Sequence, residues 1–285
     1  MKCRLLALIA ALTLVGCEAD PTLILPDPPP HLPPPATTSA FDPARSGTIA
    51  GRVTWAGPLP ESPTFLYGVP DGTGNFVTRL LTGPNQPRID TATRAVAGAV
   101  VFVQGIDPAA CRPWDHPPVR VELADQTIRV RQGERGPDRV GFVRRGDAVE
   151  VVSHEAVYNV LRGRGAAFFS LSFPDPQRVR TRTFTEPGRV ELSSGAGFYW
   201  ASADLFVTDH PYWTTTDASG GFTLTAVPAG PAEIVVWHPG WLPARQDRDP
   251  ETGLISRMTY APPVERVGRA GVAAGRTTDI AVSLP

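Results

Sequence analysis

Lysine is almost absent from this sequence, because Lys2 is the only one among 285 residues. A lysine amine forms Schiff bases with carbonyl substrates, and a lysine also contacts phosphates in nucleotide-binding loops. Lys2 lies in a leader that we expect to be removed, so both chemistries are excluded from the mature chain. The 27 basic residues minus Lys2 and Arg4 leave 25 arginines against 28 acidic residues. This near-neutral balance offers no broad basic field, so we expect no nucleic-acid partner.

Cysteine is also scarce, since the chain holds only Cys3, Cys17 and Cys111. Cys3 belongs to the leader and Cys17 is expected to carry lipid, so Cys111 remains alone and no intramolecular disulfide is available. Pro113 and Trp114 follow closely, which favours burial of Cys111. Pairing of its thiol with a partner protein stays open.

Long hydrophobic runs are missing except for residues 5–15, which follow Lys2 and Arg4. A membrane-spanning helix needs about 20 apolar residues, so this run is too short to span and has the layout of a signal sequence. Residues 14–17, which end in Gly16 and Cys17, resemble the bacterial lipobox. The resemblance implies cleavage after residue 16, acylation of Cys17 and attachment to a membrane by lipid alone. A plain secretory signal is the alternative.

Residues 17–45 form the next part of the chain, and proline dominates residues 21–35. Such a composition favours extended polyproline II and cannot support a packed core. It predicts a stiff stalk, with recognition by a proline-binding domain as the alternative. Glu18 follows Cys17, and sorting signals at that position vary between bacteria. The sequence therefore leaves open which envelope membrane, and which face of it, carries the protein.

No long segment of residues 46–285 has the apolar stripe of a helix. The segment instead contains short β-branched or alternating runs bounded by Gly, Pro or Asp. We expect an all-β fold of antiparallel β-sandwiches. The predicted strands are residues 48–55, 99–103, 119–123, 127–131, 148–152, 166–173, 178–184, 188–192, 221–224, 232–237 and 277–284.

Residues 217–237 resemble the second half of a carboxypeptidase regulatory-like, transthyretin-type sandwich. Asp217 and Gly220 suit a tight turn, Phe222 and Leu224 share one strand face, and Gly230 precedes an apolar strand. Residues 47–53 and 97–103 match the first half of such a module. The resemblance implies a sandwich built from residues 46–104 and 208–285, with residues 105–207 inserted in it or adjoining it.

The inserted segment resembles cupredoxins, in particular plastocyanin-like exported bacterial proteins. The resemblance rests on residues 146–151, 158–160 and 187–190 and on Phe184. It implies a copper site at the positions of Tyr158, Gly195, Phe198 and Ala201. Blue copper needs two imidazoles and a thiolate, usually with a thioether. These four residues supply none of them, so we expect a metal-free segment without a cofactor.

Aromatic residues occupy the glycine-rich loop at residues 194–201. Phe198, Tyr199 and Trp200 are consecutive there, and Tyr212 and Trp213 follow downstream. One interpretation is that these side chains fill the vacated copper pocket. The other is that the five aromatics are exposed together and bind a glycan or an envelope protein.

Histidines and arginines supply the remaining candidate sites. His154, His210 and His238 lack the close paired spacing of zinc ligands, so a metal site requires them to converge in the fold. Ser153, His154 and Glu155 are neighbours on a predicted strand, where successive side chains point to opposite faces, so we expect no catalytic triad. Two arginine clusters, Arg144 with Arg145 and Arg162 with Arg164, could bind an anionic ligand or could simply face solvent.

The sequence therefore predicts a non-enzymatic, lipid-anchored protein of the bacterial cell envelope, with a binding or structural role. Its expected partners are the membrane, through the lipid on Cys17, and an envelope protein or glycan. The first alternative is a copper-binding or electron-transfer protein with unusual histidine ligands. The second is a carbohydrate- or protein-binding module that uses exposed aromatics.

Overall fold

The structure is a computed structural model that describes residues 40–61, 63–70, 73, 75–251, 253 and 255–285. The predicted signal sequence, Cys17 and the stalk up to residue 39 lie outside the described residues. Among the described residues, no helix is long and apolar enough to cross a membrane. The described helical turns are η1 (Pro43–Arg45) and η2 (Pro108–Ala110).

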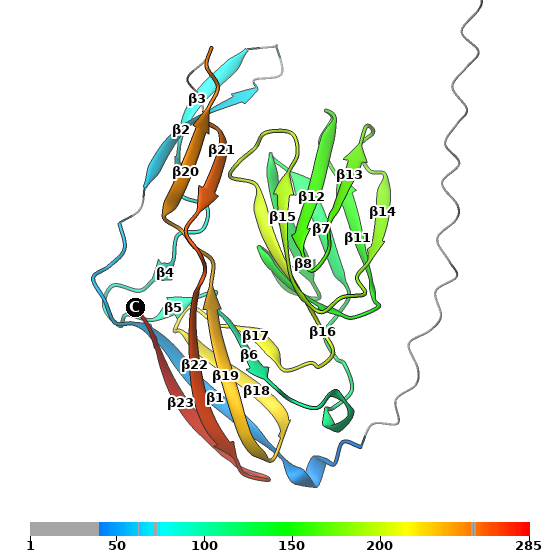
Figure 1. Ribbon diagram of the computed structural model, residues 1–285, viewed down its shortest axis with the longest axis vertical. Helices are drawn as coiled ribbons and strands as arrows, with labels where there is room; N and C mark the ends of the chain where they lie inside the picture. The colour runs from blue at the N-terminus through cyan, green and yellow to red at the C-terminus, as the bar shows by residue number, and fades with distance from the viewer. Residues whose placement is uncertain (1–39, 62, 71–72, 74, 252, 254) are drawn as a thin grey trace, which may run out of the picture. The chain divides into compact units, whose positions relative to one another are not determined.

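The predicted all-β sandwich fold is confirmed, and sandwich 1 is built from both ends of the described chain (Figure 1). Alternate side chains of its two sheets, among them Ile49, Phe222 and Ile234, meet in a shared buried core. One sheet has the order β18 (Gly221–Pro228), β1 (Ser46–Trp55), β23 (Thr277–Leu284). The other has the order β17 (Trp213–Thr215), β6 (Val100–Gln104), β19 (Gly230–His238), β22 (Val264–Val272).

Sandwich 2 comes from the middle of the chain, and its two sheets enclose a second core that includes Val121, Leu161 and Leu205. One sheet, named the F sheet here, has the order β10 (Val140–Arg144), β16 (Ser202–Thr208), β15 (Gly188–Ser194), β12 (Asn159–Gly165), β13 (Phe169–Phe173). The other has the order β14 (Val179–Thr183), β11 (Ala148–Ser153), β7 (Val119–Ala124), β8 (Thr127–Gln132), β9 (Arg135–Asp138).

The chain thus completes β1 and β6 of sandwich 1, forms all strands of sandwich 2, and returns to sandwich 1 with β17. Strand β1 pairs with β18 and β23, which lie far downstream in the sequence. The domain limits at residues 46–104, 105–207 and 208–285 and the transthyretin-type likeness remain proposals.

Strand direction differs from the expected antiparallel pattern at three pairs. Strand β1 runs parallel to β23, β10 runs parallel to β16, and β7 runs parallel to β11. Alternation of apolar residues specifies which face is buried and carries no information on the direction of the neighbouring strand. Sequence periodicity therefore could not reveal these pairs.

A third buried cluster joins the two sandwiches. Phe142 and Phe206 point away from the core of sandwich 2 and pack against Trp213 and Trp237 of sandwich 1. The alternation along β16 explains this arrangement, because Leu205 and Val207 face the sandwich core while Phe206 faces outward. The outer face of the F sheet is therefore covered at its β10 and β16 side.

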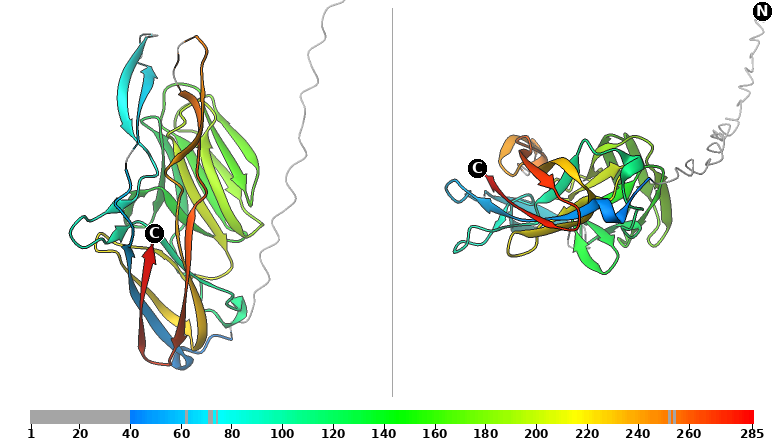
Figure 2. Two further views of the ribbon diagram at one scale, coloured as in Figure 1. Left: turned by 60° about the vertical axis from the view of Figure 1, so that its left-hand side comes forward. Right: turned by 90° about the horizontal axis from the view of Figure 1, so that it is seen from below.

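Two hairpins extend beyond the strands of sandwich 1 (Figures 1 and 2), and sequence analysis did not predict either of them. They are β2 (Thr64–Pro70) with β3 (Phe76–Thr82), and β20 (Pro243–Arg248) with β21 (Ile255–Tyr260). A short pair, β4 (Arg88–Ile89) with β5 (Val96–Ala97), completes the described strands. Leu66 and Leu80, which are paired in the first hairpin, are 59% and 67% exposed, so the usual alternation of buried and exposed residues is weak there.

Candidate binding clefts beside the aromatic loop

The four positions that the cupredoxin resemblance assigns to copper lie at one end of the F sheet. Tyr158 directly precedes β12, while Gly195, Phe198 and Ala201 lie in the loop between β15 and β16. The Gly195 amide donates to the Val160 carbonyl oxygen at 2.7 Å, which joins the loop to the start of β12. Tyr158 is 59% exposed, and its hydroxyl lies 3.2 Å from Ser172 Oγ.

The aromatic loop packs inward. Trp200 is buried, and the rings of Phe198 and Tyr199 lie 5.4 and 5.1 Å from its ring. The β2–β3 hairpin contacts the same cluster, because Phe65 lies edge-on to Tyr199 at 6.5 Å and the adjoining Leu81 packs against the core of sandwich 2. Trp200 therefore fills space at the end of the sandwich, while Phe198 and Tyr199 are half-buried.

Tyr212 and Trp213 do not join a surface with the loop, which corrects the hypothesis of five aromatics exposed together. Tyr212 is fully buried in the core of sandwich 1, and its hydroxyl donates to the Ala226 carbonyl oxygen at 2.8 Å. Trp213 is buried between the sandwiches, stacked on Phe102 at 4.0 Å. Large aromatic rings contribute most to folding stability when they are removed from water. The order of residues in the sequence alone could not show where in the fold these two rings are buried.

The three candidate metal-binding histidines lie in separate surroundings. His154 Nδ1 is 3.0 Å from Gln177 Nε2. His210 stacks on Tyr212 and Trp213, and burial lowers its pKa to about 4. Burial likewise lowers the pKa of His238 to about 4, and its Nδ1 donates to the Pro239 carbonyl oxygen at 2.8 Å. Within the described ranges, no group of three His, Cys, Asp or Glu side chains could hold a metal ion.

Ser153, His154 and Glu155 lack the arrangement of a triad. The Ser153 side chain is buried, and its hydroxyl accepts the Glu155 amide at 3.3 Å. The Glu155 carboxylate accepts the Gln126 amide at 2.6 Å, while His154 turns to Gln177. The three side chains therefore have different partners.

Cys111 is buried in the core of sandwich 1, so the favoured interpretation of this residue is confirmed. Its thiol donates to the Asp107 carbonyl oxygen at 3.1 Å, and burial raises its pKa to about 12. The thiolate that reacts or binds metal is therefore suppressed at neutral pH.

Sequence analysis missed a buried ionic cluster next to the aromatic loop. Arg139 donates to the Ser202 carbonyl oxygen at 2.9 Å, and its guanidinium also contacts Ser202 Oγ and the Pro84 carbonyl oxygen. Arg189 Nε donates to Asp204 at 2.8 Å. Burial raises the pKa of Asp204, and Arg189 opposes that rise. The one signal was the charge at position 204 inside an otherwise apolar run.

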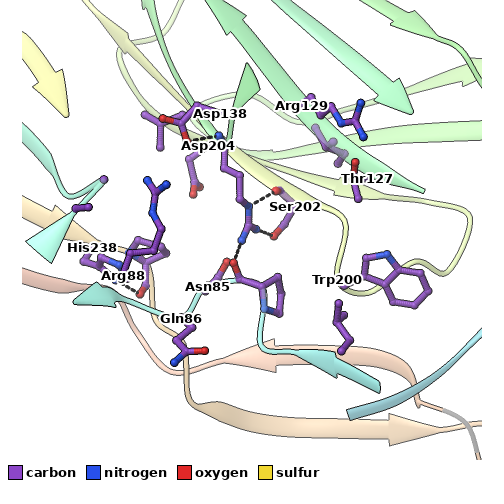
Figure 3. Close-up of a pocket in the computed structure, with 18 residues that line it drawn as sticks. Asn85, Gln86, Arg88, Thr127, Arg129, Asp138, Trp200, Ser202, Asp204 and His238 are labelled. Atoms are coloured by element: carbon purple, nitrogen blue, oxygen red, sulfur yellow. Dashed lines mark hydrogen bonds between the residues drawn. The ribbon is translucent and has the colours of Figure 1, made fainter. Parts of the chain in front are cut away.

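Two clefts adjoin this cluster. The His238 cleft has a volume of about 480 Å³ and is lined by Arg88, Arg129, Asp138, Trp200 and His238, among others. Figure 3 shows Asp138, Asp204 and Ser202 grouped in its middle, with His238 and Arg88 on one side and Trp200 on the other. Arg139 already donates to three oxygen atoms, on Ser202 and Pro84. The ionic cluster therefore serves mainly to hold together the segments that line this cleft.

The second cleft, named the Arg162 cleft, has a volume of about 500 Å³. It lies between the outer face of the F sheet and residues 257–263, and it includes Arg162, Arg164, Tyr199, Arg257 and Tyr260. Arg144 and Arg145 lie elsewhere, and Arg145 forms an ion pair with Asp209 at 2.7 Å. Of the two arginine clusters noted in the sequence, only Arg162 with Arg164 lines this cleft.

The chain is similar to solved structures of cupredoxins at low identity and with partial coverage. A copper(I) amicyanin mutant is 17% identical with a TM-score of 0.26, over 38% of this chain and 98% of amicyanin. The copper-containing nitrite reductase from Thermus scotoductus is 16% identical with a TM-score of 0.27, over 36% of this chain and 24% of the reductase. A purple cupredoxin from Nitrosopumilus maritimus is 10% identical with a TM-score of 0.24, over 31% and 98% of the two chains. No protein family and no curated protein sequence matches the chain.

Proposed function

We propose that this chain is a lipid-anchored, non-enzymatic protein of the bacterial cell envelope, in which a cupredoxin-like sandwich without copper ligands serves binding or architecture. The supporting observation is the residue set at the end of sandwich 2. The cupredoxin resemblance assigns the ligand positions to Tyr158, Gly195, Phe198 and Ala201, and Tyr199 of the loop that carries three of them contacts Phe65.

These residues do not fit copper. A blue-copper site needs imidazole nitrogens and a cysteine thiolate, and the four positions offer a phenol and carbon side chains. Cys111, the one cysteine among the described residues, lies in the core of the other sandwich. The packed loop is typical of a site whose volume has been taken over by hydrophobic contacts.

The envelope location is supported by the sequence of the leader. The short apolar run, Gly16 and Cys17 match the lipobox pattern, and the proline-rich stalk would separate the folded part from the membrane surface. Acyl chains on Cys17 would then provide the attachment.

The copper part of the proposal is tested on the full chain, expressed with its leader and purified from membranes. After loading with Cu(II) and exhaustive dialysis, we expect substoichiometric copper by elemental analysis and no intense visible absorption. One bound copper per chain with a visible charge-transfer band would contradict the proposal and favour the electron-transfer alternative.

The anchoring part is tested with Cys17→Ser. The unchanged chain is expected in the membrane fraction with an acyl-modified Cys17 by mass spectrometry. The variant cannot accept the lipid and is expected to lose that modification and to be processed differently or retained with its leader. Recovery of the unchanged chain as an unmodified soluble protein would sink the lipoprotein assignment.

A further inference from the structure

The Arg162 cleft carries more positive charge than its own carboxylates neutralise. Four arginines line it, at positions 162, 164, 189 and 257, against Glu191 and Asp204. Arg189 takes both carboxylates, with Nε 2.8 Å from Asp204 and an Nη 3.5 Å from Glu191. Arg162, Arg164 and Arg257 form no ion pair with a described carboxylate. The cleft therefore has three guanidinium groups available for an anion.

The strand pairing fixes the direction of two of these arginines. Arg162 and Arg164 are two residues apart on β12 and share its outer face, opposite Ser193 and Glu191 of β15. Gly163 faces the core between them, where a Cβ would clash with the Phe169 ring. Phe169 thus packs tightly beneath the strand, so β12 cannot rotate the arginines inward without disrupting its core contacts.

The end of β15, the aromatic loop and β21 complete the cleft with groups that suit a sugar. Phe198 and Tyr199 bring aromatic rings, and Ser193 and Thr259 bring hydroxyls. The Tyr260 hydroxyl is buried and has no hydrogen-bond partner in the described part of the chain. A buried polar atom without a partner costs free energy, which a ligand could recover if the Tyr260 side chain turns toward the cleft.

We propose that the Arg162 cleft binds a carboxylated oligosaccharide, a ligand class that specifies the binding role proposed above and rests on it. Guanidinium groups pair with carboxylates through two parallel hydrogen bonds, which favours uronate groups. Aromatic rings pack against the apolar faces of sugar rings, and hydroxyls exchange hydrogen bonds with sugar hydroxyls. The volume lies within the range of small-ligand sites. The lining is rich in arginine and hydroxyl side chains, which disfavours the acyl chain of a lipid.

The test is calorimetric titration of the lipid-anchored chain in detergent with a panel of uronate trisaccharides, including trigalacturonate and a glucuronate-containing trisaccharide. Maltotriose serves as the neutral match, and inorganic phosphate and a hexaglutamate peptide serve as other anions. We expect binding of at least one uronate trisaccharide that weakens as salt rises, and none of maltotriose. Absence of binding across the panel, or equal affinity for phosphate or hexaglutamate, would overturn the proposal.

Variants locate the site. The double variant Arg162→Gln with Arg164→Gln is expected to weaken binding by about tenfold or more, because each charged hydrogen bond is strong. The control variant Arg266→Gln with Arg276→Gln removes the same two charges at exposed positions outside the cleft. Equal losses in the double variant and the control would place the effect in the overall charge and contradict the site.

Tyr260→Phe separates binding from folding. Its hydroxyl has no partner to lose among the described residues, so the thermal midpoint should stay unchanged or rise slightly while uronate binding weakens by about threefold to tenfold. Unchanged binding in this variant would remove Tyr260 from the site. Copper content and membrane fractionation are measured on the same preparations, so failure of uronate binding is distinguishable from failure of the anchored, copper-free assignment.

Discussion

The two halves of the outer face of the F sheet belong to one sheet and have opposite character. On the β10 and β16 side, Phe142 and Phe206 are covered by Trp213 and Trp237 of the other sandwich. On the β12 side, Arg162 and Arg164 line an open cleft. The difference shows how one sheet face can supply both a structural joint and a candidate binding surface. The buried aromatics Phe142, Phe206, Trp213 and Trp237 form the contact between the sandwiches, named the joint. The guanidinium groups of Arg162 and Arg164, which form no ion pair with a described carboxylate, provide the candidate binding surface.

Arg189 and Asp204 lie at the boundary between these halves. The guanidinium of Arg189 sits 5.0 Å from the Trp237 ring and donates to Asp204, so it contacts the joint and the cleft wall together. An arginine stacked on tryptophan contributes through cation–π attraction and through its ion pair. The position of the cleft is therefore coupled to the packing of the joint.

The largest expected effect comes from breaking the joint with Trp237→Ala. Trp237 is 2% exposed and packs edge-on against Phe206 at 5.1 Å. Truncating a buried tryptophan typically costs about 3–5 kcal/mol of unfolding free energy. Urea denaturation of both chains measures the loss, and Trp237→Phe provides a milder variant if the alanine form does not fold. A loss below about 1 kcal/mol would show that the joint contributes little.

The next largest effect is acid destabilisation through two histidines. Burial lowers the pKa of His210 and His238 from 6.5 to about 4. Between pH 6.5 and 4 the unfolded chain binds protons that the folded chain excludes, so unfolding free energy falls as the pH falls. The combined loss is expected to be about 3 kcal/mol, most of it from the buried His238, because His210 is only partly buried and solvent screens its charge. The urea midpoint, measured from pH 7 to pH 4, reports it.

Single variants assign this acid sensitivity to the two regions. His210 stacks on Trp213 at the joint, with Asp209 beside it, whereas His238 lines the His238 cleft near Arg88 and Arg139. His210→Asn and His238→Asn are each expected to flatten the pH dependence in this window. A variant whose slope matches that of the unchanged chain would show that its histidine does not titrate differently on unfolding.

The smallest expected effect is on the open half of the same face. Arg164 is exposed and forms no ion pair with a described carboxylate, so Arg164→Gln should change unfolding free energy by less than about 0.5 kcal/mol. The same urea titration used for Trp237→Ala measures it. A loss of 2 kcal/mol or more would make Arg164 structural and remove the contrast between the halves.

Much of the strand pattern could be predicted because alternation along a strand reports burial directly. Residues 127–131 and 148–152 were expected as strands, and the structure has β8 and β11 there. The two hairpins were missed because their side chains are largely exposed, as Leu66 and Leu80 illustrate. The candidate site was predicted in part: the arginines at 162 and 164 were noted, whereas Arg257 and Tyr260 come from a missed hairpin.

The sequence by itself determined the all-β class and the scarcity of cysteine and histidine, because composition and period-two alternation are local properties. It also predicted burial of Cys111. Only the tertiary structure decided that Tyr212 and Trp213 are internal and that Arg162, Arg164 and Arg257 line one cleft. These placements depend on contacts between residues far apart in the chain, and an alternating pattern does not specify which distant face covers another.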